Sequence, residues 1–262
     1  MSISIFTRNA VFRKYDIQSS LDHPETTIQH REIIFQKSFL KRIYLKWYNE
    51  IYENVTFDSD TIHLELGSGG GFLKDVFPHV LTSDLLDLPY VDKKINAESL
   101  PFHTNTISSI SMLNVFHHIP RPYLFLAEAQ RVLVKGGRII MIEPANTPFS
   151  RFIYKNFHHE LFDVKGSREI QAGAPLSNSN QALPYIYFLR DVKEFDAEFS
   201  KLRITKYRNH TPFLYILSGG VSRTAMVPAF SFSFFNLIEK IFSPFNNFTG
   251  LFSTIVIQKV DE

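Results

Sequence analysis

Cysteine is absent from this chain of 262 residues. Its absence excludes disulfide bonds, thiolate metal sites and a cysteine nucleophile, and it leaves the redox compartment open. Hydrophobic residues are plentiful, and their share of 44% is ample for the core of one α/β domain with elaborations.

An excess of charge of either sign is also missing, because 28 basic residues stand against 26 acidic ones. Proteins that bind nucleic acid usually carry a basic patch, and no basic stripe with interleaved aromatic residues occurs here. We therefore expect no nucleic-acid partner.

Neither a secretion signal nor an uninterrupted apolar span is indicated by the sequence. Residues 1–8 have no basic region before an apolar core. Residues 224–258 are poor in charge, but Pro228 and Pro244 interrupt them, so they do not resemble a membrane span. These features predict a cytoplasmic protein, with contact to the inner face of a membrane as an open possibility.

Residues 61–71, with the sequence TIHLELGSGGG, are the most informative segment. Apolar residues at alternate positions indicate a strand, and Gly67, Gly69 and Gly71 follow before an apolar run that suits a helix start. Glycines let the backbone turn sharply and let a ligand come close to it. Free N–H groups at the helix start would face that ligand.

The spacing of these glycines separates two kinds of nucleotide site. A dinucleotide fingerprint requires G-x-G-x-x-G, and a phosphate loop ends in Gly-Lys-Ser/Thr. This chain has G-x-G-x-G and no such ending. A phosphate cradle is therefore disfavoured, and a dinucleotide-dependent oxidoreductase is only a minor alternative.

With the acidic residue before them, the glycines resemble motif I of the class I S-adenosylmethionine-dependent methyltransferases. The segments that follow are similar to those of the methyltransferase type 11-like subfamily, over roughly the central third of the chain. The resemblance implies S-adenosyl-L-methionine as cofactor. At this turn it implies five cofactor-binding residues: Glu65, Gly67, Ser68, Gly69 and Gly71.

The next part of the family pattern is a short second strand that ends in an acidic residue. Asp84 takes this position, where the family places a carboxylate that accepts hydrogen bonds from both ribose hydroxyls, and Leu85 follows it. Asp87 would take this role if the strand ended later. We prefer Asp84 and interpret Asp87 as a solvated loop residue.

The segment NAESLPF, residues 96–102, resembles the family's D-A-x-x-L-P-F segment. The first side chain of that segment meets the adenine amino group. Here it is Asn96, whose amide oxygen still accepts a hydrogen bond although the charge is lost. Asn96, Ala97 and Glu98 are therefore predicted to bind the cofactor.

The segment NVFHHIP follows a predicted strand at residues 107–113. The resemblance places Asn114 and His117 near the methionine half of the cofactor and the methyl group. His118 is the weaker candidate, because two adjacent histidines point in different directions.

Strands and helices alternate between residues 61 and 144, which predicts parallel strands with crossover helices and ligands at the carboxyl ends of the strands. The resemblance extends this to a doubly wound, Rossmann-like α/β/α fold with three layers and a seven-stranded, mostly parallel sheet. In the family the last strand is antiparallel and inserted between its neighbours. Residues 202–207 and 254–259 are the candidates for the last two strands.

Two segments surround this core. Residues 1–58 are predicted to form an N-terminal helical cap, because apolar residues between 33 and 51 recur at helical spacing. Residues 59–262 would form the methyltransferase domain, including a hydrophobic insertion at 209–252. The phenylalanine-rich part of that insertion, 224–252, could complete the core as a helical pair, close as a lid over an apolar acceptor, or contact a membrane or partner.

Methyl transfer is an in-line displacement, so alignment supplies most of the catalysis. A base is needed only if the acceptor must lose a proton, and the candidates are His117, His158 and His159. The letters HHE at 158–160 also suggest metal ligands. No further ligand accompanies them at a recognisable spacing, so no metal site is predicted.

The sequence therefore predicts an S-adenosylmethionine-dependent methyltransferase that acts on a small-molecule, lipid-linked or glycan-linked acceptor. The alternative is a catalytically silent protein of the same fold that serves as a binding or partner subunit. The acceptor atom, the use of a base and the oligomeric state stay open.

Overall fold

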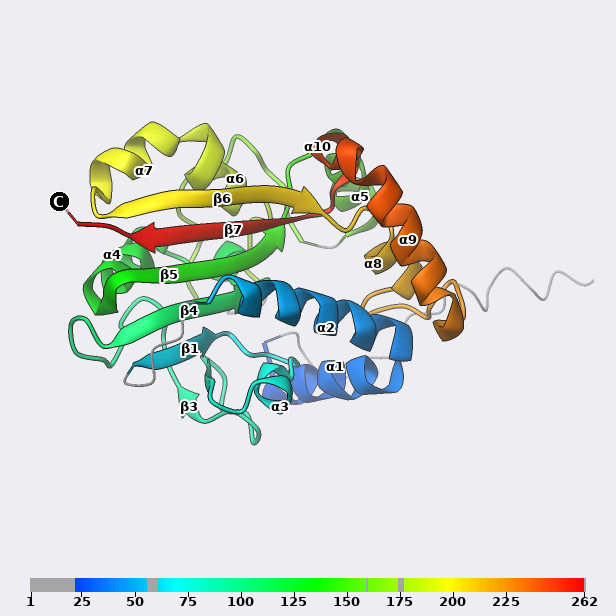
Figure 1. Cartoon of the computed structure of the whole chain (residues 1–262), viewed down its shortest axis with the longest axis horizontal. Coiled ribbons are helices and arrows are strands. Elements are labelled where there is room, and N and C mark those ends of the chain that lie inside the picture. Colours follow the sequence, from blue (N-terminus) through cyan, green and yellow to red (C-terminus); the bar gives the residue numbers. More distant parts are fainter. Residues whose placement is uncertain (1–21, 56–60, 159, 174–176, 262) are drawn as a thin grey trace, which may run out of the picture.

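The computed structural model describes residues 22–55, 61–158, 160–173 and 177–261. In these residues one sheet contains seven strands in the order β3-β2-β1-β4-β5-β7-β6 (Figure 1). The strands are β1 (Ile62–Leu66), β2 (Leu81–Asp84), β3 (Lys93–Lys94), β4 (Ile107–Leu113), β5 (Leu133–Pro144), β6 (Leu202–His210) and β7 (Phe252–Lys259).

The strand directions confirm the predicted sheet. Strands β1 to β5 pair in parallel, and β7 pairs antiparallel with both β5 and β6, between which it lies. The last strand is thus the inserted antiparallel one. Both strands expected at the end of the chain form, and each begins or ends a few residues beyond its predicted bounds.

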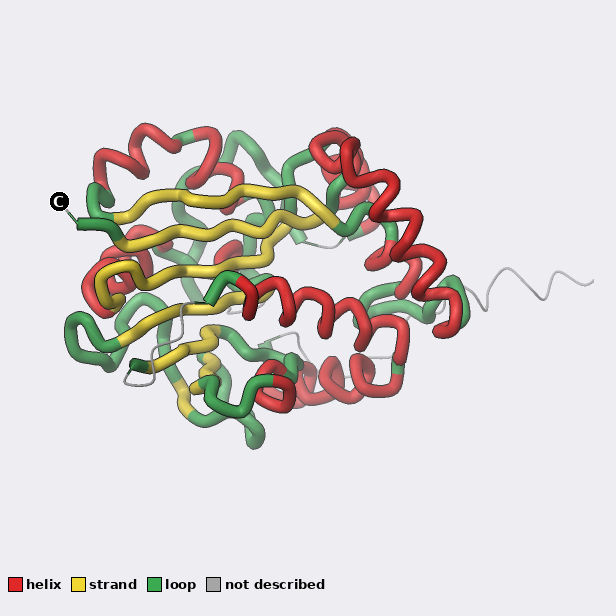
Figure 2. Tube along the Cα trace, in the orientation of Figure 1, coloured by secondary structure: helices red, strands yellow, loops and turns green. Residues whose placement is uncertain are grey.

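Helices cover both faces of the sheet, which gives three layers (Figure 2). The α-helices are α1 (Pro24–Gln36), α2 (Ser38–Glu53), α3 (Leu73–Val76), α4 (Pro122–Val132), α5 (Pro148–Phe157), α6 (Leu183–Tyr185), α7 (Val192–Glu198), α8 (Leu214–Ser218), α9 (Phe232–Phe242) and α10 (Asn246–Thr249). The 3-10 turns are η1 (Phe116–His118), η3 (Ala229–Ser231) and η4 (Ser243–Phe245), and η2 (Ile186–Arg190) is a π-helical turn.

Two apolar cores hold these layers together, because side chains alternate between the faces of a strand. Ile139 and Met141 of β5 pack with α4, α6, η2 and α7, whereas Ile140 and Ile142 pack with α2, α8 and α9. A strand that is apolar on both faces is typical of a sheet covered on both sides. The apolar run in β5 therefore accounts for the presence of helices on both faces of the sheet.

The N-terminal segment differs from the single long helix that its apolar spacing suggests. It forms α1 and α2, which are separated at Lys37 (φ −94°, ψ 87°). The Lys37 ammonium donates to the carbonyls of Gly220 at 2.5 Å and Arg223 at 2.7 Å, and burial lowers the pKa of Lys37 to about 8. These contacts tie the junction between the two helices to the C-terminal third of the chain. The cap boundary at residue 58 stays a prediction.

The helix expected after the glycine turn is also shorter than its apolar run suggests. It is α3, a single turn of four residues. Phe77 precedes Pro78, and a residue before proline is disfavoured in helical geometry; its angles are φ −127° and ψ 86°. The turn therefore presents a short run of backbone N–H groups rather than the end of a long helix.

The insertion between β6 and β7 contains α8, η3, α9, η4 and α10. Helix α9 lies along one end of the sheet, beside α8 (Figure 1). Among the helices that the structure describes, none combines the length and apolarity that a membrane crossing needs.

Candidate functional site

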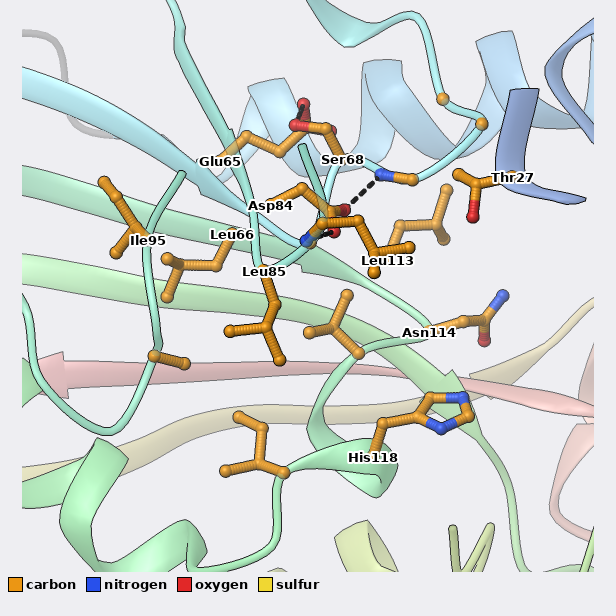
Figure 3. A pocket seen from close by; sticks show the side chains of 18 of the residues that line it. Thr27, Glu65, Leu66, Ser68, Asp84, Leu85, Ile95, Leu113, Asn114 and His118 are labelled. Atoms are coloured by element: carbon orange, nitrogen blue, oxygen red, sulfur yellow. Dashed lines mark hydrogen bonds between the residues drawn. The ribbon is translucent and has the colours of Figure 1, made fainter. Parts of the chain in front are cut away.

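A cavity of about 210 Å³ lies at the carboxyl ends of β1, β2 and β4 (Figure 3). Ligands of doubly wound sheets bind at this edge, where the direction of winding reverses. The cavity is bounded by the glycine turn after β1, the end of β2, residues 95–97, the segment from β4 to residue 120, and side chains of α1 and α2.

Most of the predicted cofactor-binding residues meet around this cavity. Only two of them, Glu98 and His117, do not line it. Those that do are Glu65, Gly67, Ser68, Gly69, Gly71, Asp84, Leu85, Asn96, Ala97 and Asn114. Their roles toward a ligand stay predictions, and the structure supplies the geometry from which each can be argued.

The glycine turn has no room for side chains at two positions. Gly67 has φ +66°, and a Cβ added there would lie 2.5 Å from a methyl carbon of Val115. At Gly71 an added Cβ would lie 2.6 Å from the hydroxyl oxygen of Tyr48 and 2.7 Å from the carbonyl oxygen of Ser68. The glycines therefore keep the backbone close to its neighbours and leave the cavity open.

Two buried carboxylates shape the same turn. Glu65 accepts a hydrogen bond from the Ser68 hydroxyl at 2.6 Å. Asp84 accepts backbone N–H bonds from Gly69 and Leu86, both at 2.8 Å (dashed in Figure 3). Burial raises the pKa of Asp84 and raises that of Glu65 to about 7. Asp84 thus connects the end of β2 to the glycine turn.

Of the candidate residues near Asp84 and in the segment 96–98, some line the cavity and others do not. Asp87 is exposed and does not line the cavity, whereas Asp84 lines it. Asn96 lines it, and its side-chain oxygen accepts the backbone N–H of Glu98 at 3.0 Å. The Glu98 carboxylate instead pairs with Arg121 at 2.6 Å. Glu98 therefore has a structural partner outside the cavity.

Asn114 combines two uncommon features. It adopts a left-handed backbone conformation (φ +57°), which non-glycine residues rarely do. Its side-chain oxygen is buried and has no hydrogen-bond partner among the described residues, although Asn114 lines the cavity. A buried acceptor without a partner costs about 1–3 kcal/mol, so a ligand that donates to it would recover that energy.

The two adjacent histidines take the opposite places from those expected. His118 lines the cavity, whereas His117 lies behind it and is only 3% exposed. His117 Nδ1 donates to Glu143 at 2.6 Å, and its Nε2 lies 3.4 Å from a Glu160 oxygen. Burial alone would lower the pKa of His117, but the two carboxylates raise it to about 9. Burial lowers the pKa of His118 to about 3.

Of the other two proposed bases, the structure describes only His158. His158 follows the last residue of α5, and its Nδ1 lies 2.7 Å from the Gln181 side-chain nitrogen. His158 does not line the cavity. His159 lies outside the described residues. Helix α5 runs from Pro148 to Phe157, so His158 lies at its C-terminal end rather than at its start.

Three side chains from α1 and α2 line the cavity and were not predicted: Thr27, Tyr44 and Tyr48. The Tyr48 hydroxyl accepts the backbone N–H of Phe72 at 2.8 Å, and the Arg31 guanidinium donates to the carbonyl of Gly71. The spacing of four between the two tyrosines places them on one helix face, which could have indicated their role.

Comparison with known proteins agrees with this geometry. Residues 64–141 match the family model described as a methyltransferase domain. The chain is 26% identical over 125 residues to the ubiquinone/menaquinone biosynthesis C-methyltransferase UbiE of Rhizobium rhizogenes, a match that covers 43% of this chain and 45% of that protein.

Two further similarities were found, one in sequence and one in structure. The chain is 29% identical over 119 residues to the ribosomal RNA small subunit methyltransferase G of Malacoplasma penetrans, over 44% of this chain and 45% of that protein. A solved S-adenosylmethionine-dependent methyltransferase from Thermotoga maritima superimposes with a TM-score of 0.51 at 12% identity, over 91% of this chain and 100% of that one. The latter shows a shared fold.

The fold and the glycine-lined cavity define a Rossmann-like methyltransferase domain. Residues 64–141 are therefore similar to the class I S-adenosylmethionine-dependent methyltransferases, and the cofactor that this similarity indicates is S-adenosyl-L-methionine. The cavity suits that group, because it offers a buried acceptor without a partner at Asn114 beside a glycine cradle. The chain spans about half the length of the curated relatives it matches.

Proposed function

We propose that this protein transfers a methyl group from S-adenosylmethionine to a hydrophobic small-molecule or lipid-linked acceptor. The observation that supports it most is the unpartnered Asn114 oxygen beside the glycine turn. An ammonium group, such as that of the methionine part of the cofactor, would donate to this oxygen.

The remaining parts of the cofactor have candidate partners around the same cavity. Asp84 would accept hydrogen bonds from the ribose hydroxyls, while its bonds to the glycine turn keep the carboxylate oriented. Asn96 and Ala97 would meet the adenine. When bound, the cofactor supplies an electrophilic methyl group. The protein supplies proximity and alignment, which account for most of the catalysis in a displacement of this kind.

The side of the cavity near His118 is the candidate acceptor side. Its neighbours there, Ile119 and Val115, are apolar. Because burial lowers the pKa of His118 to about 3, this imidazole is a poor base at neutral pH. An apolar acceptor whose nucleophilic atom is already electron-rich fits these surroundings, and a relative named for C-methylation in ubiquinone/menaquinone biosynthesis supports that class.

The insertion presents an apolar face to solvent, which we name the phenylalanine surface. Its members, exposed between 56% and 86%, are Phe230, Phe234, Leu237, Ile241, Phe245 and Phe248. No described residue of 224–252 lines the cavity, so the lid interpretation has no support there. Exposed apolar patches of this kind mark membrane or partner contacts. We propose that this surface rests on a membrane, from which a lipid-linked acceptor would be drawn.

Incubation of the protein and methyl-labelled cofactor with a cell extract tests the proposal. The extract is divided into lipid and aqueous phases, and Asp84→Ala serves as the control with impaired cofactor binding. We expect label in the lipid phase with the wild type and little with the variant. Label confined to the aqueous phase would refute the hydrophobic acceptor. Cofactor binding without any transfer would favour the silent-subunit alternative.

A further inference from the structure

A group of three potential metal ligands lies beside the cavity. His117 and His118 belong to η1, after β4, and Glu160 follows α5. One ring nitrogen of each histidine and one oxygen of Glu160 all lie within 4.8 Å of one another. The letters HHE at 158–160 suggest metal ligands in the sequence, but no separated ligand accompanies them there. In the fold, Glu160 from this segment lies beside two histidines of a different segment, His117 and His118.

The distance between the ligand atoms of His117 and Glu160 is close to the distance between two ligands of one metal ion. His117 Nε2 lies 3.4 Å from the Glu160 oxygen. Two ligands that each lie about 2.1 Å from one ion are themselves separated by roughly 3.0–3.4 Å in octahedral or tetrahedral geometry. An ion could therefore enter between these two atoms with little movement of either side chain.

The hydrogen-bond partner of His117 is of the kind that orients metal-bound histidines in proteins. His117 donates from Nδ1 to Glu143 at 2.6 Å, which leaves Nε2 toward Glu160. Glu143 is itself fixed, because it accepts the backbone N–H groups of Val115 and Phe116, both at 2.7 Å. A histidine that binds metal through one nitrogen and a carboxylate through the other is a common arrangement in metalloproteins.

A second observation points to a ligand here. His118 Nδ1 is buried and has no hydrogen-bond partner among the described residues, although the backbone of Asn178 lies near the imidazole ring. A buried imidazole nitrogen with a free lone pair costs energy unless a donor or a metal ion engages it. His118 also lines the cavity, so the group is accessible from the side where a substrate would bind.

The geometry points to a site for one divalent transition-metal ion, held by His117, His118 and Glu160. Two imidazoles and one carboxylate suit Zn²⁺, Fe²⁺, Mn²⁺ or Co²⁺, whereas Mg²⁺ and Ca²⁺ prefer shells of oxygen alone. Three protein ligands leave coordination positions open toward the cavity, where an oxygen atom of an acceptor or a water molecule would bind. The inference does not depend on methyl transfer, because metal binding can be measured without it.

Co²⁺ is the probe for the test, because its visible absorption reports on the coordinating atoms. Tag-free full-length protein is stripped with a chelator, dialysed and titrated with Co²⁺, and binding is followed by calorimetry and absorption. We expect one Co²⁺ per chain and competition by Zn²⁺ but not by Mg²⁺. Glu160→Gln and His118→Gln should each weaken binding at least tenfold.

The controls separate a specific site from loss of structure. His79→Gln changes an exposed histidine away from the cavity and should leave Co²⁺ affinity unchanged. Circular dichroism of the metal-free variants checks that each is folded, and His118→Gln is preferred to a change at the more buried His117. No stoichiometric uptake of Co²⁺, or uptake that both site variants retain, would overturn the inference. The group would then be a buried ion pair only.

Discussion

Asp84 provides the sharpest test of the cofactor site, because Asp87 lies three residues away and offers a matched control. Asp84→Asn keeps the size of the side chain and removes its charge. Both carboxylate oxygens accept backbone N–H bonds at 2.8 Å, from Gly69 and Leu86. An amide has only one acceptor oxygen, so its NH₂ group must face one of these N–H donors.

The expected loss follows from these contacts. A hydrogen bond to a charged group contributes about 1.5–3 kcal/mol, and the amide loses at least one such bond in the turn and weakens those proposed to the ribose. A net loss of about 2–3 kcal/mol corresponds to roughly 30- to 150-fold weaker binding. Calorimetric titration with S-adenosylmethionine measures it.

The control decides between a specific and a general effect. Asp87→Asn changes an exposed side chain outside the cavity and should leave affinity within about twofold of the wild type, which is below 0.5 kcal/mol. Thermal unfolding of the cofactor-free Asp84→Asn protein shows whether the turn alone has been damaged. Affinity within threefold of the wild type in Asp84→Asn would refute the ribose assignment.

Three further predictions concern the helical cap, the edge of the sheet and the phenylalanine surface. Tyr48→Phe removes the acceptor of a buried backbone N–H bond and should lower the free energy of unfolding by about 1–3 kcal/mol, measured by urea denaturation. Burial alone would raise the pKa of Glu50, but His210 and the bond from Arg208 lower it to about 2. Its contribution, up to about 3 kcal/mol, should therefore be present above pH ~4.5 and be lost as the pH falls toward 2; urea denaturation of Glu50→Gln beside the wild type measures it. Phe234→Ser should weaken binding to anionic lipid vesicles about tenfold or more in flotation assays, because burying a phenylalanine is worth about 1.5–3 kcal/mol.

Exposed residues supply the controls for these three. Tyr123 is exposed on α4, which packs on the face of the sheet opposite to α2 and α9. Tyr123→Phe should therefore retain the stability of the wild type, and Tyr123→Ser should retain its binding to vesicles. Glu194→Gln alters an exposed carboxylate and should leave the pH profile unchanged. A stability gap between wild type and Glu50→Gln that stays constant from pH 7 to pH 2.5 would contradict the electrostatic argument. Equal vesicle binding by wild type and Phe234→Ser would contradict membrane contact through this surface.

The part of the cavity lined by the glycine turn and Asp84 was predictable because its signals are local. The spacing from Gly67 to Gly71 and the acidic end of the next strand are both contained in short segments, and parallel strands bring such ends together. The number of strands and the antiparallel, inserted last strand were implied by the family resemblance.

The other side of the cavity depends on tertiary contacts that no local pattern encodes. One turn of η1 decides that His118 rather than His117 reaches the cavity. Glu160 contacts His117 although more than forty residues separate the two in the sequence. Lys37, at the break between α1 and α2, likewise contacts a carbonyl far away in the sequence, that of Gly220. The bond from the Phe72 backbone N–H to the Tyr48 hydroxyl joins two separate segments, so no local pattern predicts it.

The position of β7 has a consequence for the way this chain is made. Strand β6 has β7 as its sheet neighbour, and β5 meets β7 along seven residue pairs from Arg138–Gln258 to Pro144–Phe252. During synthesis, the edge of β5 that pairs with β7 therefore has no partner strand until residue 259 has left the ribosome. At roughly 5–20 residues per second, that interval is on the order of 10 s. Throughout it, an apolar strand edge is open to other chains, so a nascent chain that stalls before residue 252 would be a target for chaperones or aggregation.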